Sequence, residues 1–126
     1  TTTSTVPGYR FNGITTTTYS TTWLGGDGTT ASSGRTTSQT SQSLLQVGGT
    51  SSTVPFLITI DVFSYAGSTN KTSLYTTSND LNGTGQVERG VGLWSNTSAI
   101  TSFSVFMAAT TFAAGTTATL YGILKA

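Results

Sequence analysis

The sequence predicts an all-β fold: an antiparallel, jelly-roll-like β-sandwich of about seven to nine short strands. Three observations support this class. Thr is abundant and is accompanied by Val, Ile, Phe, Tyr and Trp, which suit a pleated, half-buried surface. Apolar and polar residues alternate with a period of two in several short runs. These runs recur about every dozen residues between clusters of Gly, Ser and Asn, without a convincing helix.

The 126 residues are enough for one domain with a single core. We expect residues 1–8 to form an extended lead-in and residues 9–126 to form one sandwich domain. The expected strands, in chain order, are residues 9–14, 18–24, 42–47, 56–65, 71–77, 87–94, 100–107 and 117–124. The Gly- and Ser-rich stretch 25–34 has the composition of a loop.

The first strand and the central hairpin have clear face patterns. In residues 9–14, Tyr9 and Phe11 share a face. In residues 56–65, the side chains of Phe56, Ile58, Ile60 and Val62 alternate with those of Leu57, Thr59, Asp61 and Phe63. A turn of about five residues then leads into 71–77, so we expect a β-hairpin there.

The later strands alternate as well. Val87, Arg89, Val91 and Leu93 lie on one side of 87–94, and Phe103, Val105 and Met107 lie on one side of 100–107. The last run, 117–124, is apolar enough to be a buried strand. Its loss should then unfold the domain, because deleting a buried apolar side chain costs roughly 2–5 kcal/mol.

Charge and hydropathy argue against two kinds of partner. Only 7% of the residues are charged, the net charge is +1, and the basic residues are scattered singly. A nucleic-acid binder needs clustered basic side chains, so we expect no nucleic-acid partner. No stretch approaches the ~20 apolar residues of a membrane span, so we expect no membrane partner.

The residue inventory also argues against catalysis. His and Cys are both absent, which removes the commonest general base, the commonest zinc ligands and the thiol nucleophile. A glycosidase would need two carboxylates about 5–9.5 Å apart, and Asp80 with Glu88 is the candidate pair, although two solvated turn charges are the simpler interpretation. Asp61 could form a structural ion pair with Lys71 across the hairpin. We therefore expect a non-enzymatic protein with no catalytic residues.

Two binding motifs are weak. The oxygen-rich run 79–85 resembles a calcium loop but lacks the regular carboxylate spacing and the closing Glu. We therefore predict no metal and no cofactor. Several aromatic residues could form a sugar-stacking platform, although in a small sandwich they are more often core or interface anchors. They are Tyr9, Tyr19, Trp23, Tyr65, Tyr75, Trp94 and Tyr121.

The C-terminal half resembles a domain found in structural proteins of tailed bacteriophages. The pattern is a strand with Asp, a short Asn-Lys turn, Gly-x-Trp, AITS, an apolar strand, FAAGT and LYGI. Its first part falls on Asp61, Asn70, Lys71, Gly92 and the AITS residues 99–102. The residues that we single out from it are Trp94, Ile100, Phe112, Gly115, Leu120, Tyr121, Gly122 and Ile123. The earlier half, from residue 9, fits more loosely, and the additional N-terminal strands common in the family are not seen here.

The resemblance implies a virion protein on the outer surface of the particle. Such proteins are capsid decoration or cement proteins, head fibres or tail-associated modules, and they are commonly jelly-roll-like homotrimers. The partner implied is the major capsid protein or another virion protein. A carbohydrate-binding or host-adhesion module of a tail or fibre protein is the alternative.

Overall fold

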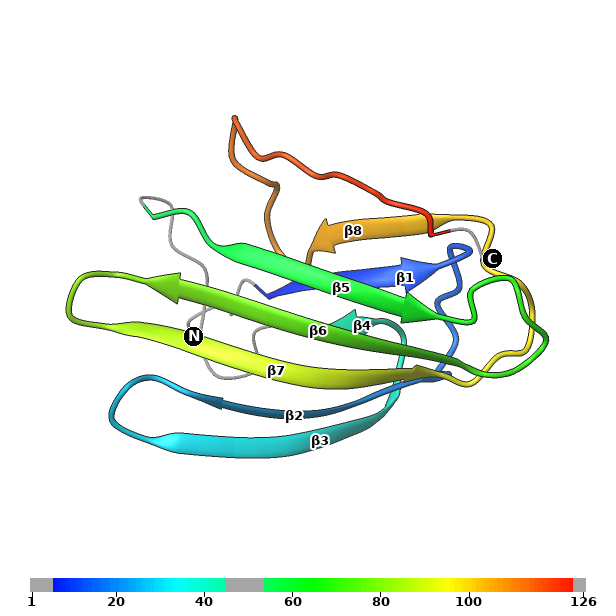
Figure 1. Cartoon of the computed structure of the whole chain (residues 1–126), viewed down its shortest axis with the longest axis horizontal. Coiled ribbons are helices and arrows are strands. Elements are labelled where there is room, and N and C mark those ends of the chain that lie inside the picture. Colours follow the sequence, from blue (N-terminus) through cyan, green and yellow to red (C-terminus); the bar gives the residue numbers. More distant parts are fainter. Residues whose placement is uncertain (1–5, 45–53, 124–126) are drawn as a thin grey trace.

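Two antiparallel sheets face each other in the computed structural model, which describes residues 6–44 and 54–123 (Figure 1). The predicted all-β sandwich is confirmed. The strands are β1 (Pro7–Phe11), β2 (Tyr19–Gly26), β3 (Ala31–Gln39), β4 (Gln42–Ser43), β5 (Leu57–Phe63), β6 (Lys71–Asp80), β7 (Gly85–Trp94) and β8 (Phe103–Met107).

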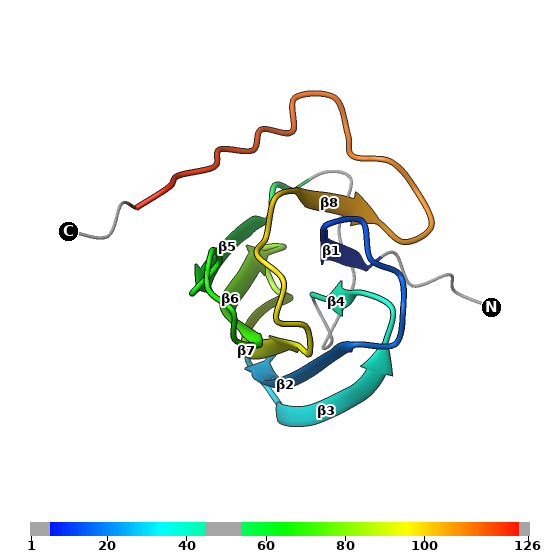
Figure 2. The same ribbon diagram turned by 90° about the vertical axis from the view of Figure 1, so that its right-hand side faces the viewer.

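The smaller sheet has the order β4-β1-β8, and the larger sheet has the order β3-β2-β7-β6-β5. Strands β1 and β8, which are far apart in the chain, pair along their whole length from Pro7↔Met107 to Phe11↔Phe103. The view along the strands in Figure 2 shows the two layers, with β5 and β8 as neighbouring edges on one side.

Aromatic side chains fill the space between the sheets. Tyr9 and Phe11 from β1 are buried there, which confirms the face predicted for this strand. The Phe11 ring lies 5.4 Å from the Trp94 ring and 5.5 Å from the Tyr9 ring, centroid to centroid. Tyr19, Leu44 and Tyr75 complete the buried cluster.

The predicted hairpin is confirmed as β5 and β6. Ile58, Ile60 and Val62 pack against the core from the inner face of β5 and are only partly buried. Asp61 lies on the outer face, where its cross-strand neighbour is Leu74.

Strand β7 has the predicted alternation, but its apolar face is the outer one. Val87, Val91 and Leu93 are exposed by 38–55%. The inner face carries Glu88, Gly90, Gly92 and Trp94, all buried. The glycines leave room for neighbouring side chains, since a Cβ on Gly90 would lie 2.3 Å from the Tyr75 ring.

Two boundaries predicted near the N-terminus are wrong. Pro7 and Gly8, expected in the lead-in, are buried in β1. The expected loop 25–34 contains the end of β2, a tight turn and the start of β3. Its polar composition hid β3 because this strand is covered on one face only. Of the expected strand 42–47, Gln42 and Ser43 form β4, and residues 45–47 lie outside the described residues.

The predicted final strand is also wrong over its described part. Residues 117–123 have no strand partner, and no sheet includes them. Leu120, Tyr121 and Ile123 are 82%, 83% and 87% exposed. The remaining residue of that expected strand, 124, lies outside the described part of the chain. The apolar pattern of this segment is not matched by any strand pairing within the described part of the chain.

Candidate functional site

The two candidate catalytic carboxylates are not brought together. Glu88 is fully buried on the inner face of β7, where its Oε1 accepts a 2.7 Å hydrogen bond from the Tyr75 hydroxyl. Asp80 is exposed at the end of β6, and its Oδ1 accepts a hydrogen bond from the backbone N–H of Asn82. Burial and, to a lesser extent, the Glu88 carboxylate raise the pKa of Tyr75 above its ordinary value.

A second buried pair has the same structural character. The Tyr9 hydroxyl lies 2.6 Å from the Ser73 Oγ between the two sheets. Burial raises the pKa of Tyr9 strongly, and the hydrogen bond with Ser73 opposes this only in part. Both tyrosines are therefore neutral hydrogen-bonding groups. Tyr9 joins β1 to β6 across the two layers, whereas Tyr75 joins the neighbouring strands β6 and β7 of the larger sheet.

The predicted Asp61–Lys71 ion pair is wrong, because the two side chains lie on opposite faces of the hairpin. Lys71 is fully buried on the inner side. Its Nζ donates hydrogen bonds to the carbonyl oxygens of Gly67, Thr69 and Thr97. This ammonium group thus ties the loop before β6 to the segment after β7.

Most of the candidate sugar-stacking aromatics belong to the core. Tyr9, Tyr19, Tyr75 and Trp94 are at most 1% exposed, and Trp23 packs against the same cluster. Tyr65 and Tyr121 are exposed, by 46% and 83%. They come from different parts of the chain, the loop after β5 and the C-terminal segment, and form no ring contact with each other.

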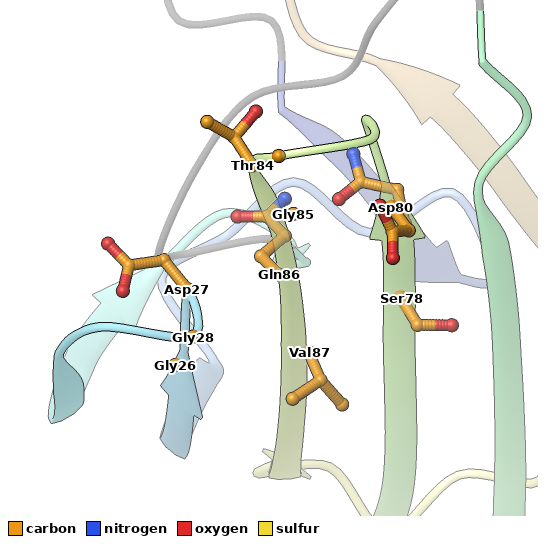
Figure 3. Close-up of a pocket in the computed structure, with 11 residues that line it drawn as sticks. Gly26, Asp27, Gly28, Ser78, Asp80, Thr84, Gly85, Gln86 and Val87 are labelled. Atoms are coloured by element: carbon orange, nitrogen blue, oxygen red, sulfur yellow. The ribbon is translucent and has the colours of Figure 1, made fainter.

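A shallow, open depression lies between the tips of two hairpins (Figure 3). Asp27 and Gly28 line it from the β2–β3 turn, and residues 78–80 and 83–87 line it from β6, β7 and the turn between them. The carboxylates of Asp27 and Asp80 each accept hydrogen bonds from their own turn. The backbone N–H groups of Thr30 and Thr29 and the Thr29 hydroxyl donate to Asp27 and lower its pKa to about 2.

The run that resembles a calcium loop is a hairpin turn. Asn82 and Gly83 both have positive φ, 55° and 120°, as a type I′ turn requires. The Leu81 N–H donates to the Thr84 carbonyl and closes the turn. Among the described residues, no three acidic, His or Cys side chains lie close enough to hold a metal ion.

The AITS motif is held by a residue that the sequence did not single out, Asn12. Its Oδ1 accepts hydrogen bonds from the N–H groups of Thr101 and Ser102, and its Nδ2 donates to the Ala99 carbonyl. Ile100 packs against the core in between. Asn12 has a positive φ of 53°, a conformation that Asn tolerates better than most residues. The motif therefore fixes the crossover from β7 to β8.

The remaining motif residues lie in a C-terminal arm, residues 108–123. Phe112, Leu120, Tyr121 and Ile123 are all exposed, and Gly115 has a left-handed φ of 89°. The arm begins at the end of β8 and runs outward from the sandwich (Figure 2). Ala108 donates a hydrogen bond to the Val6 carbonyl, and beyond it the described arm has only the local bonds from Thr116 to Ala113.

The sandwich is incompletely covered along the side bordered by β5 and β8. Val105 is opposite Tyr9 in the pairing of β1 with β8 and shares its face, yet it is 38% exposed. The inward residues Ile58, Ile60 and Val62 of β5 are likewise only partly buried. We call this strip the open side.

Comparison with protein-family models, with curated protein sequences and with solved structures yields no match. Within residues 6–44 and 54–123, no helix has the length and hydropathy needed to cross a membrane.

Proposed function

We propose that this chain is a non-enzymatic structural protein of a tailed-bacteriophage virion. In this proposal it is a capsid decoration, cement or head-fibre protein located on the outer surface of the particle. Its partner is the major capsid protein or another virion protein, and it acts as a homotrimer. The starting point is the resemblance of the AITS, FAAGT and LYGI run to that family.

The observation that carries the proposal is the exposed C-terminal arm. Residues 108–123 contain no charged side chain, and three of their large apolar side chains are more than 80% exposed. Exposure of these side chains to water does not stabilise a monomer, whereas contiguous exposed apolar groups are typical of interaction sites. Such an interaction segment suits an attachment protein in a repetitive assembly.

The hydrogen bonds made by the charged and polar side chains support the proposal that the protein is not an enzyme. Three buried groups form hydrogen bonds within the chain: Lys71, Glu88 and the Tyr9–Ser73 pair. Asp27 and Asp80 accept hydrogen bonds from their own turns. These side chains therefore stabilise the sandwich and its turns.

Co-sedimentation with capsids tests the proposal. Purified protein is mixed with phage capsids that lack this chain and is centrifuged, with unrelated capsids as the control. We expect saturable binding to the matched capsids, with a whole number of copies per capsomer. Failure to sediment with the capsids, or equal binding to the unrelated ones, would contradict the proposal.

A glycan array tests the alternative of host adhesion. Among the candidate sugar-stacking aromatics, Tyr65 is the exposed one on the described sandwich body. Binding to a defined glycan that is lost in Tyr65→Ala but kept in Phe63→Ala would favour adhesion. Phe63 is a suitable control because its side chain is exposed to a similar extent, 49% against 46%.

A further inference from the structure

We propose that residues 117–123 of one copy pair with the free edge of β5 in a second copy of this chain. The arm would then cover the open side of the neighbouring sandwich. This inference rests on the homotrimer of the proposed function and deepens it by naming how two copies meet, and it can be tested on the purified protein without capsids. It identifies both the surface and its occupant.

The donor segment is a strand without a sheet. Residues 117–123 are rich in Thr, Leu, Tyr and Ile, which favour strands, and they contain no charge. Their side chains are exposed, and none of their backbone groups has a partner within the described chain. A partner that supplies a strand edge would satisfy these groups and bury the apolar side chains together.

The acceptor is the edge of β5. This strand pairs with β6 on one side and ends the larger sheet on the other. Its outer face exposes Leu57 by 64% and Phe63 by 49%, and its inner face leaves Ile58, Ile60 and Val62 partly buried. Neither Lys nor Pro protects the edge, although Asp61 places one charge on its outer face. An added strand therefore gains apolar contacts on both faces.

Donor and acceptor match in length and in alternation. Both β5 and the segment 117–123 have seven residues, which in a strand span about 24 Å. In the donor, Leu120 would point to one face, and Tyr121 and Ile123 to the other. Beside β5, one donor face would continue the inner side formed by Ile58, Ile60 and Val62, and the other would lie next to the exposed Leu57 and Phe63.

The course of the arm favours a second copy over its own sandwich. Figure 2 shows the arm leaving the end of β8, passing back over that strand and extending away on the side of β5, so that its described end lies clear of both sheets. The connector 108–116 has nine residues and can span up to about 30 Å, with a local turn at Ala113–Thr116. Each copy carries one donor and one acceptor, so the contact is head-to-tail and closes into a ring when the rotation allows it.

The first experiment measures mass in solution. Light scattering after size exclusion should show an oligomer for the wild-type chain. The double variant Leu120→Asp with Ile123→Asp should elute as a 13.0 kDa monomer with an unchanged circular-dichroism spectrum. Leu24→Asp is the control, because Leu24 on β2 is 64% exposed but lies three strands from β5. A monomeric wild type, or an oligomer that survives the double substitution, overturns the inference.

The second experiment locates the acceptor. The chain has no Cys, so single Cys variants can be linked selectively with a short bismaleimide. Ile123→Cys chains are unfolded and refolded together with Leu57→Cys chains, or with Leu24→Cys chains as the control. Leu57 and Leu24 are both 64% exposed, yet they lie in strands about 14 Å apart.

We expect Ile123→Cys and Leu57→Cys chains to form mixed cross-linked dimers of twice the chain mass. We expect no such product when Leu24→Cys chains replace the Leu57→Cys chains. Equal yields would show that the arm does not select β5. In a last experiment, a chain carrying both Ile123→Cys and Leu57→Cys is refolded in an excess of wild-type protein. A link within that single chain would show that the arm folds back on its own body, which also overturns the inference.

Discussion

Gly90 is the residue on which the packing of Tyr75 depends. The Tyr75 side chain lies over the Gly90 backbone, and an added Cβ would come within 2.3–2.4 Å of three of its atoms. We expect Gly90→Ala to lower the free energy of unfolding by roughly 1–3 kcal/mol, because a buried ring has to move. Urea unfolding measures the change. Gly122→Ala is the control, since nothing lies within 4 Å of its added Cβ, and equal stability of the two variants would contradict this account.

Tyr75 should also give the stability a dependence on alkaline pH. Burial and the Glu88 carboxylate raise its pKa, so the folded state holds the phenol proton after the unfolded chain, with a pKa near 10, has released it. This contribution is complete below about pH 10 and is lost as the pH rises further. The slope per group approaches about 1.4 kcal/mol per pH unit.

Replacing Tyr75 by Phe tests this sign. The variant should lose stability less steeply than the wild type between about pH 10 and about pH 12, because one titrating group is gone. Tyr9, which is also buried with a raised pKa, remains in both proteins. Chemical denaturation at several pH values gives the two slopes, and parallel curves would show that Tyr75 titrates normally.

At the level of elements, the crossover between β7 and β8 depends on one turn after β1. The Asn12 side chain bonds to three residues of the AITS motif, so a segment about 90 positions away is fixed to the first strand. This explains why a motif of small polar residues can be structural without being buried. Only Ile100 among them contributes a large apolar side chain to the core.

Asn12→Gly isolates this contribution. Glycine keeps the left-handed backbone of 53° and removes the side chain, so the backbone is not strained. We expect a loss of about 1–3 kcal/mol for the lost hydrogen bonds, measured by urea unfolding. Asn82→Gly is a matched control, because Asn82 has a φ of 55° in a hairpin turn and its side chain accepts or donates no hydrogen bond. Similar losses in both variants would assign the effect to the backbone.

At the level of the whole molecule, we expect the stability of the sandwich to be independent of the arm. Beyond Ala108, the described arm bonds only to itself, and its apolar side chains are exposed. Removing residues 110–126 should therefore leave the circular-dichroism spectrum and cooperative unfolding of the monomer intact. It should also abolish any dependence of the unfolding midpoint on protein concentration. Loss of cooperative unfolding would instead mean that the arm belongs to the core of its own chain.

The strands with strict alternation could be predicted from the sequence, because burial of one face imposes a period of two. Residues 56–65 are the clearest case, and β5 confirms the alternation over Leu57–Phe63. Strand β3 could not be predicted, because Ala31 is its only apolar side chain and the other residues are Ser, Thr, Gly, Gln and Arg35. Its backbone pairing with β2 holds it in place without an apolar pattern.

The candidate site was predictable only in part. Local composition identified the apolar run 117–123 and the motif around Trp94, but not which of them is buried. Trp94 at the end of β7 is enclosed because Phe11 of β1 and Tyr19 of β2 pack against its ring. Leu120 is exposed because no strand among the described residues pairs with its segment. Likewise, Val87, Val91 and Leu93 alternate correctly, yet the face that they occupy points outward.

The sequence by itself determined the class of fold, the central hairpin and the lack of His and Cys chemistry, because these follow from residue types and short-range periodicity. Only the tertiary structure decided that Asp61 and Lys71 lie on opposite faces, that Asn12 holds the AITS crossover, and that the last apolar run stands away from the sandwich. Each of these depends on which distant segments become neighbours. Pairing between distant strands sets those neighbours, and no local pattern encodes it.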